Sequence, residues 1–126
     1  MRVVVWDTVD VVAKDAEGTS DVYGRCFFDS KKQVRETDCH YRCSNGKASF
    51  NYRLLFDIKA PQDFYLFTLQ LWDRDLFASN DIIGEVQMDL KALFDDVIES
   101  GKMMNVNKKY YDSYLCTKLN EEKYTF

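Results

Sequence analysis

The chain has 126 residues, of which 46% are hydrophobic and 15% are aromatic. This composition predicts one globular domain with a hydrophobic core and excludes intrinsic disorder. The formal charge of −4 argues against nucleic acid as a partner, because phosphate binding requires a basic surface. No apolar run reaches the roughly 18 to 20 residues that span a bilayer, and residues 1–25 lack the order of a signal peptide. We therefore expect a cytoplasmic protein with reduced cysteines that serve as packing residues.

Strand patterns dominate the first ninety residues. Apolar residues alternate with polar ones between short polar turns, and these patterns predict strands at residues 2–6, 21–28, 36–43, 50–58, 64–72 and 82–88. In the fourth strand, alternation places one set on the core face: Phe50, Tyr52, Leu54, Phe56 and Ile58. Many short strands joined by turns predict an all-β antiparallel sandwich.

One short helix is expected near residues 89–100. Its apolar residues follow helical spacing and form one stripe: Leu90, Leu93, Phe94, Val97 and Ile98. Asp89 is the expected N-cap, and Gly101 is the expected stop. We expect this helix to cover one end of the sandwich, whereas residues 102–126 show no comparably clear pattern.

Two clusters of aspartates fall between predicted strands. Asp15 and Asp21 form the first cluster, and Asp73, Asp75 and Asp81 form the second. Both clusters contain turn-forming residues, so the carboxylates should gather at loop tips. Calcium prefers six to eight oxygen ligands and would offset the repulsion among crowded carboxylates. One such cluster taken alone is more typical of a solvated acidic loop, but the two clusters together predict a calcium site formed by the five aspartates.

These clusters occur in segments with a recognisable pattern. The segments Asp15-x5-Asp21-x-Tyr23 and Trp72-Asp73-x-Asp75-x5-Asp81-x-Ile-Gly84 resemble the first and third calcium-binding loops of C2 domains. Residues 2–12, 37–42 and 45–53 are similar to a C2 domain of the ferlin family. The resemblance covers residues 2 to about 90. It implies an eight-stranded antiparallel C2 sandwich of type II topology, whose last strand would come from residues 108–115 or 120–125. It also implies that residues 1–126 are one C2 domain excised from a larger, multidomain ferlin-like protein.

The resemblance carries a functional expectation. It implies calcium-dependent binding to anionic phospholipid membranes containing phosphatidylserine or phosphoinositides, within a ferlin-like protein of vesicle fusion, membrane trafficking or repair. Two bound calcium ions would change the formal charge from −4 to 0 and act as an electrostatic switch. The parent protein would be anchored in a membrane outside this segment. The alternatives are a calcium-independent protein-interaction module and the targeting domain of a lipid-acting enzyme. The chain itself is not expected to be an enzyme, since it has one histidine and no glycine-rich phosphate loop.

Two sets of residues are candidates for membrane contact. Leu76 and Phe77 lie between the aspartates of the second cluster, and Ala16 lies in the first. We expect these residues to insert at the headgroup level, unless Leu76 or Phe77 folds inward to support its loop. A possible phosphoinositide-binding set is basic: Arg25, Arg42, Lys47 and Arg53. Scattered basic residues on strands are also common for solubility alone.

Overall fold

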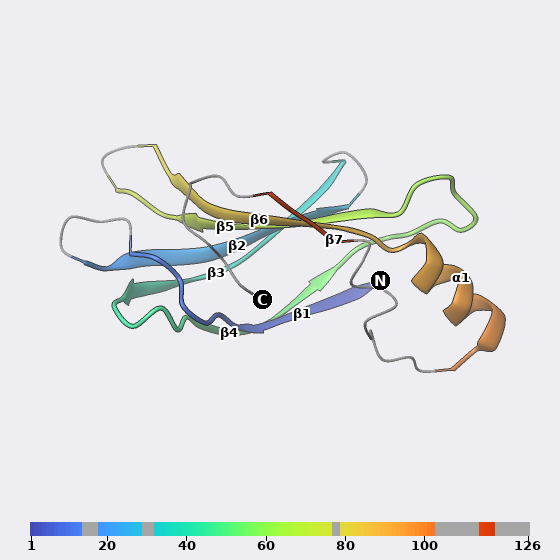
Figure 1. Cartoon of the computed structure of the whole chain (residues 1–126), viewed down its shortest axis with the longest axis horizontal. Coiled ribbons are helices and arrows are strands. Elements are labelled where there is room, and N and C mark those ends of the chain that lie inside the picture. Colours follow the sequence, from blue (N-terminus) through green and yellow to red (C-terminus); the bar gives the residue numbers. More distant parts are fainter. Residues whose placement is uncertain (14–17, 29–31, 77–78, 103–113, 118–126) are drawn as a thin grey trace.

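A computed structural model describes residues 1–13, 18–28, 32–76 and 79–102, together with the backbone of residues 114–117. The elements, in chain order, are β1 (Arg2–Asp7), β2 (Ser20–Phe28), β3 (Gln33–Cys43), β4 (Ser49–Leu55), β5 (Leu66–Asp73), β6 (Asp81–Asp89), α1 (Lys91–Ser100) and β7 (Tyr114–Thr117). The larger sheet has the order β3-β2-β5-β6-β7, and a smaller sheet pairs β1 with β4. All of these strand pairs are antiparallel, and the two sheets pack as a sandwich (Figure 1).

The predicted strands and helix are confirmed, with boundaries that move by a few residues. β7 overlaps the expected last strand, 108–115, at residues 114–115 and pairs with β6. The described part of the chain contains seven strands, so the expected eighth strand does not lie within it. No helix among the described residues has the length and apolar character needed to cross a bilayer.

The core consists of two clusters of buried side chains between the sheets. One cluster lies toward α1 and contains Cys26, Phe28, Leu54, Phe56, Tyr65 and Phe67. The other contains Val22, Cys43, Ala48, Phe50 and Ile83. Full burial of a large apolar side chain contributes about 1.5 to 3 kcal/mol, so these clusters account for much of the stability of the fold. Cys26 and Cys43 are buried free thiols, as predicted, and burial raises the pKa of Cys26 to about 12.

The predicted alternation of the fourth strand is wrong at Tyr52. Phe50, Leu54 and Phe56 are buried, but Tyr52 is 37% exposed. The pairing of β1 with β4 shifts register between Val5 and Asp7, and Asn51 has a φ of 45°. An irregularity of this kind re-aims the neighbouring side chains. Simple alternation therefore does not hold across it.

Helix α1 begins one residue later than predicted. Its N-cap is Leu90, whereas Asp89 accepts a hydrogen bond from the Lys91 N–H at 2.9 Å through its Oδ1. Gly101 ends the helix as predicted, with a φ of 62° and an N–H donated to the Val97 carbonyl at 2.9 Å. The apolar stripe is covered at its start but not at its end, because Val97 and Ile98 are exposed.

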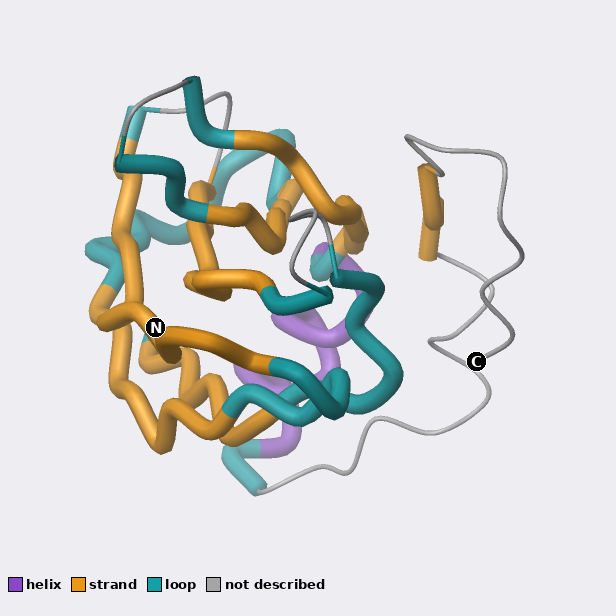
Figure 2. The backbone as a smooth tube through the Cα atoms, turned by 90° about the vertical axis from the view of Figure 1, so that its left-hand side faces the viewer, coloured by secondary structure: helices purple, strands orange, loops and turns teal. Residues whose placement is uncertain are grey.

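The elements place two groups of loops at opposite ends of the molecule. Helix α1 and the connection from β4 to β5 lie at one end of the long axis (Figure 1). The loops that follow β1 and β5 lie at the other end. In Figure 2, viewed from that loop end, α1 lies behind the sheets. The two acidic clusters therefore belong to the end that is far from the helix.

Candidate metal site

Strand pairing brings three of the predicted aspartates together. Asp73 is the last residue of β5, and its register partners are Val22 in β2 and Asp81 in β6. Asp21 precedes Val22 directly, so the three carboxylates arise from three neighbouring strands at one end of the larger sheet. Asp75 follows two residues after Asp73 in the loop between β5 and β6. The fifth predicted ligand, Asp15, lies outside the described residues.

Hydrogen bonds join the backbone and side chains of the two acidic segments. The Asp21 N–H donates to Asp73 Oδ1 at 2.6 Å, and the Arg74 N–H donates to the Asp21 carbonyl at 2.9 Å. Asp21 Oδ1 accepts the N–H of Arg42 at 2.7 Å, and Arg42 has a φ of 54°. The end of β3 therefore helps to orient the side chain of Asp21 at the start of β2.

Asp73 combines deep burial with an unsatisfied oxygen. The residue is 1% exposed, and Oδ2 has no hydrogen-bond partner among the described residues. Leaving a buried polar group without a partner costs about 1 to 3 kcal/mol, and more when the group is charged. A hard divalent cation fits this donor set, because such cations bind carboxylate oxygens in preference to nitrogen or sulfur ligands.

The neighbouring carboxylates affect the pKa of Asp75. Partial desolvation, followed by the negative charges of Asp73, Asp81 and Asp21, raises the pKa of Asp75 above its ordinary value. Within the described ranges, however, no three His, Cys, Asp or Glu side chains converge closely enough to enclose an ion. The acidic residues of the described ranges therefore form an open cluster rather than a closed metal cage.

A supporting network fixes the loop after β5. Asn80 Oδ1 accepts the Asp75 N–H at 3.1 Å, and Asn80 Nδ2 donates to the Tyr23 hydroxyl at 3.1 Å. The Arg74 guanidinium lies over the Tyr23 ring, 5.1 Å from its centroid. Neither the Arg42 backbone nor the Asn80 side chain was predicted to support the site. The role of Asn80 could have been predicted, because asparagine in a loop often hydrogen-bonds to nearby backbone. Nothing local in the sequence indicates the positive φ of Arg42.

Leu76 projects from the acidic loop. It follows Asp75 directly and is 81% exposed, so its side chain does not fold inward. The other two predicted membrane contacts, Ala16 and Phe77, lie outside the described residues. An exposed leucine between acidic residues is a candidate for insertion into a lipid headgroup layer.

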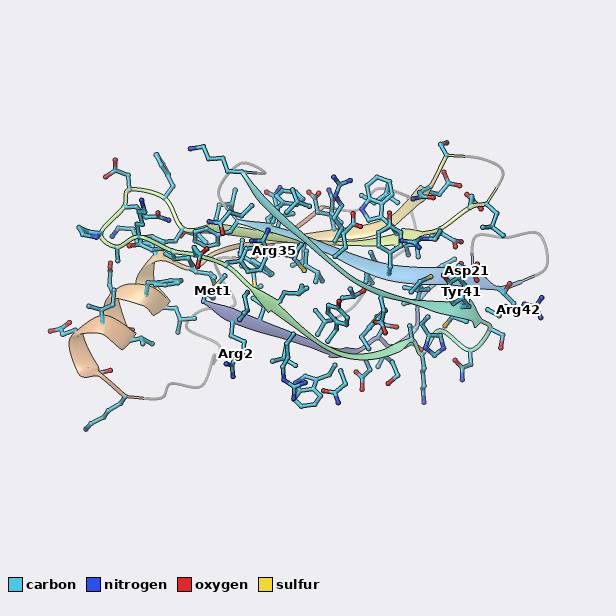
Figure 3. The ribbon with its side chains drawn as sticks, turned by 180° about the vertical axis from the view of Figure 1, so that it is seen from behind. Met1, Arg2, Asp21, Arg35, Tyr41 and Arg42 are labelled. Atoms are coloured by element: carbon cyan, nitrogen blue, oxygen red, sulfur yellow. The ribbon has the colours of Figure 1, made fainter. Side chains whose placement is uncertain are left out.

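The four basic residues expected to contact phosphoinositides are divided between surfaces. Arg25 points away from the core on the larger sheet and pairs with Glu36 at 3.6 Å. Arg53 is exposed on the outer side of the smaller sheet. Arg42 and Lys47 flank the turn between β3 and β4, and Figure 3 shows Arg42 at the same end as Asp21. Of the four basic residues, only Arg42 and Lys47 are therefore close to each other in the chain, and they lie on one side of the acidic loops.

Comparisons with known proteins show similarity in sequence and in fold. The family model of the C2 domain matches residues 1–123. Ferlin 1 of Toxoplasma gondii is 35% identical over 97 residues, which cover 75% of this chain and 7% of that protein. Myoferlin of Xenopus tropicalis is 28% identical over 117 residues, which cover 71% of this chain and 6% of that protein. The chain thus spans less than a tenth of the length of either relative.

Solved structures show the same fold. A C2 domain of plant extended synaptotagmin 1 matches with a TM-score of 0.62 at 20% identity, covering 71% of this chain and 67% of that one. A calcium-bound structure of two C2 domains of extended synaptotagmin 2 matches with a TM-score of 0.58 at 20% identity, covering 75% of this chain and 35% of that one.

Proposed function

Because the chain belongs to the C2 domain family and is similar to ferlins, we propose that it binds anionic phospholipid membranes in a calcium-dependent manner. The observation that carries the proposal is the buried Oδ2 of Asp73, which has no hydrogen-bond partner in the described part of the chain and lies beside Asp21, Asp75 and Asp81. The calcium-bound state of a structural neighbour supports the same choice of ion. Asp21, Asp73, Asp75 and Asp81 would hold calcium, with Asp15 as a fifth ligand.

The protein supplies three properties to this function. Its hydrogen bonds hold Asp21 and Asp73 in one place before any ligand arrives. Its acidic loops repel an anionic leaflet as long as their charge is not compensated. When bound, calcium supplies positive charge and coordination positions that lipid phosphates can complete. Leu76 then adds apolar contact at the headgroup level, together with Phe77 and Ala16.

The affinity of one such domain should be modest. A single inserted side chain contributes about 1.5 to 3 kcal/mol at most, which is too little for stable anchoring by itself. A ferlin-like parent protein with further membrane-binding domains would raise the effective affinity through avidity. We place the domain in such a multidomain protein, acting in the cytoplasm at a membrane during vesicle fusion, trafficking or repair.

The proposed phosphoinositide contact is smaller than the set of four basic residues expected from the sequence. Arg42 lies close to the calcium site, since its N–H binds Asp21 Oδ1, and Lys47 lies across the same turn. Both side chains are exposed. We propose this turn as the phosphoinositide contact, with Arg25 and Arg53 outside it.

The test is co-sedimentation of the domain with phosphatidylserine vesicles across a calcium titration. Wild-type protein should sediment only with calcium, and the double variant Asp73→Asn plus Asp75→Asn should stay in the supernatant. Circular dichroism would establish that the variant is folded. No sedimentation of wild-type protein at millimolar calcium would reject the membrane function and favour a protein-interaction module.

A further inference from the structure

A groove lies at the end of the molecule opposite the acidic loops. It has a volume of about 360 Å³ and is lined by Ala60, Pro61, Tyr65, Asp95, Ile98 and Glu99. The first two residues belong to the connection from β4 to β5, and the last three belong to α1. This volume is at the lower end of the roughly 300 to 1,000 Å³ typical of binding pockets. The groove can therefore receive one or two large side chains.

The floor of the groove is fixed to the core. Tyr65 is buried and stacks on Phe94 of α1, with ring centroids 4.6 Å apart. Phe28 contacts both rings, at 6.3 Å from Tyr65 and 6.4 Å from Phe94. The Leu90 N–H donates to the Tyr65 carbonyl at 2.9 Å, and the Gln62 N–H donates to its hydroxyl at 3.2 Å. A ligand would meet a preformed surface, which lowers the entropic cost of binding.

The charges of α1 oppose its own macrodipole. A helix favours acidic residues in its first turn and basic residues in its last, each by about 0.3 to 1 kcal/mol. Helix α1 has no acidic residue in its first turn and no basic residue in its last turn. Instead, Lys91 begins the helix, and Asp95, Asp96 and Glu99 follow toward its end. Asp95 pairs with Lys91 at 3.0 Å, so its charge is compensated within the helix. Glu99 and the negative end of the helix dipole therefore make the groove side favourable for a cation.

The apolar pattern of α1 is also unusual at the same place. Ile98 is 61% exposed although it continues the stripe that packs Phe94 against the core. Ile98 and Glu99 both line the groove, so an uncovered aliphatic side chain and an unfavourable acidic charge meet at one surface. Residues that reduce the stability of their own helix or strand are expected at functional surfaces.

We propose that this groove binds a basic segment of a partner protein, which places an apolar side chain against Ile98 and Tyr65 and a lysine or arginine beside Glu99. An anionic lipid is disfavoured by the acidic rim, whatever the acidic loops at the other end bind. If those loops dock on a membrane, α1 and the connection from β4 to β5, whose residues line the groove, lie at the opposite end of the molecule (Figure 1). The inference goes beyond the proposed membrane function and does not depend on it.

The experiment uses the complete 126-residue chain labelled with ¹⁵N. A short synthetic peptide that alternates lysine with leucine and contains one tryptophan is titrated against it, and a second peptide carries glutamate in place of each lysine. The lysine peptide should shift the amide resonances of Ile98, Glu99 and Ala60 in the absence of calcium. The glutamate peptide should leave them unchanged.

Surface variants make the test specific. Glu99→Lys should weaken binding of the lysine peptide by about fivefold or more, because attraction at the rim becomes repulsion. Ile98→Ser should also weaken it, since the apolar contact is lost. Asp38→Lys makes the same charge change at an exposed position in the middle of β3 and should bind the peptide like wild-type protein.

Several results would overturn this inference. The first is that the groove resonances do not shift at millimolar lysine peptide. The second is that the two peptides bind equally well. The third is that Asp38→Lys weakens binding of the lysine peptide as much as Glu99→Lys does. Persistent nuclear Overhauser contacts from residues 103–126 to Ile98 would assign the groove to the chain itself. Shifts of the groove resonances by phosphatidylserine vesicles without calcium would assign it to lipid. The same variants should co-sediment with vesicles as wild-type protein does. A failure of the membrane function would therefore be detected independently of peptide binding in the groove.

Discussion

Asp21 and Asp73, which are 52 residues apart in the chain, are joined by a hydrogen bond of 2.6 Å from the Asp21 N–H to Asp73 Oδ1. This contact uses one oxygen of a buried carboxylate and leaves the other, Oδ2, without a partner in the described structure. One oxygen therefore fixes the position of Asp73, while the other is available for a ligand. This division would let a buried aspartate support both the fold and the proposed metal site.

Calcium should stabilise the folded domain through this site. A ligand that binds only the folded state adds about 2.7 kcal/mol when its concentration is about one hundred times its Kd. We therefore expect the melting temperature to rise with calcium and to return to its starting value with a chelator. Asp73→Asn should remove most of the increase while keeping an acceptor for the Asp21 N–H. An equal increase in that variant would place calcium elsewhere.

The titration of Asp75 predicts an effect of pH on the calcium-free domain. Its pKa is raised in the folded state above the ordinary value of 3.8, by desolvation and then by the neighbouring aspartates. Between the ordinary and the raised pKa, the folded state holds more protons than the unfolded state, so the contribution of Asp75 to stability falls as pH rises.

The measurement is the difference in melting temperature between wild-type protein and Asp75→Asn across the acidic range, in the presence of a chelator. The variant should gain stability relative to wild-type protein as pH rises through that window. Carboxylates remote from Asp75 titrate alike in both proteins and cancel in the difference. A flat difference curve would show that Asp75 is not coupled to Asp73, Asp81 and Asp21.

Leu76 should contribute directly to vesicle binding. Replacement by alanine removes most of an exposed apolar side chain, and we expect about tenfold weaker calcium-dependent binding to phosphatidylserine vesicles, with calcium-free stability unchanged. Leu55→Ala is the matched control, because Leu55 is also exposed but lies on β4. Equal affinities for the two variants would mean that Leu76 does not enter the lipid layer.

The end of α1 should be sensitive to Gly101. Its φ of 62° is favourable for glycine and strained for other residues, so Gly101→Ala should cost about 1 kcal/mol of unfolding free energy. Gly84→Ala is the control, since an added Cβ at Gly84 meets no atom within 4 Å and its φ is ordinary. Chemical denaturation would measure both values. A neutral Gly101→Ala would indicate that the helix end relaxes into another conformation.

Much of the fold follows from short-range patterns. Alternation along β4 and β5 and the helical spacing from Leu90 to Ile98 each depend on neighbours within a few residues, so the sequence predicted these elements closely. The acidic clusters were also visible, because turn-forming residues surround them. The same patterns failed at Tyr52, where the register of β1 with β4 shifts.

Local patterns were thus sufficient to predict the first six strands, the helix, the all-β class and the acidic loops. The folded chain was needed to show that Val22, Asp73 and Asp81 share one row of the larger sheet, and that Arg25 and Arg53 lie on different sheets. It was also needed to show that Ile98 stays uncovered beside Glu99. The difference arises because side-chain periodicity is a local property of the backbone, whereas strand register and the burial of a surface depend on segments that are distant in the chain.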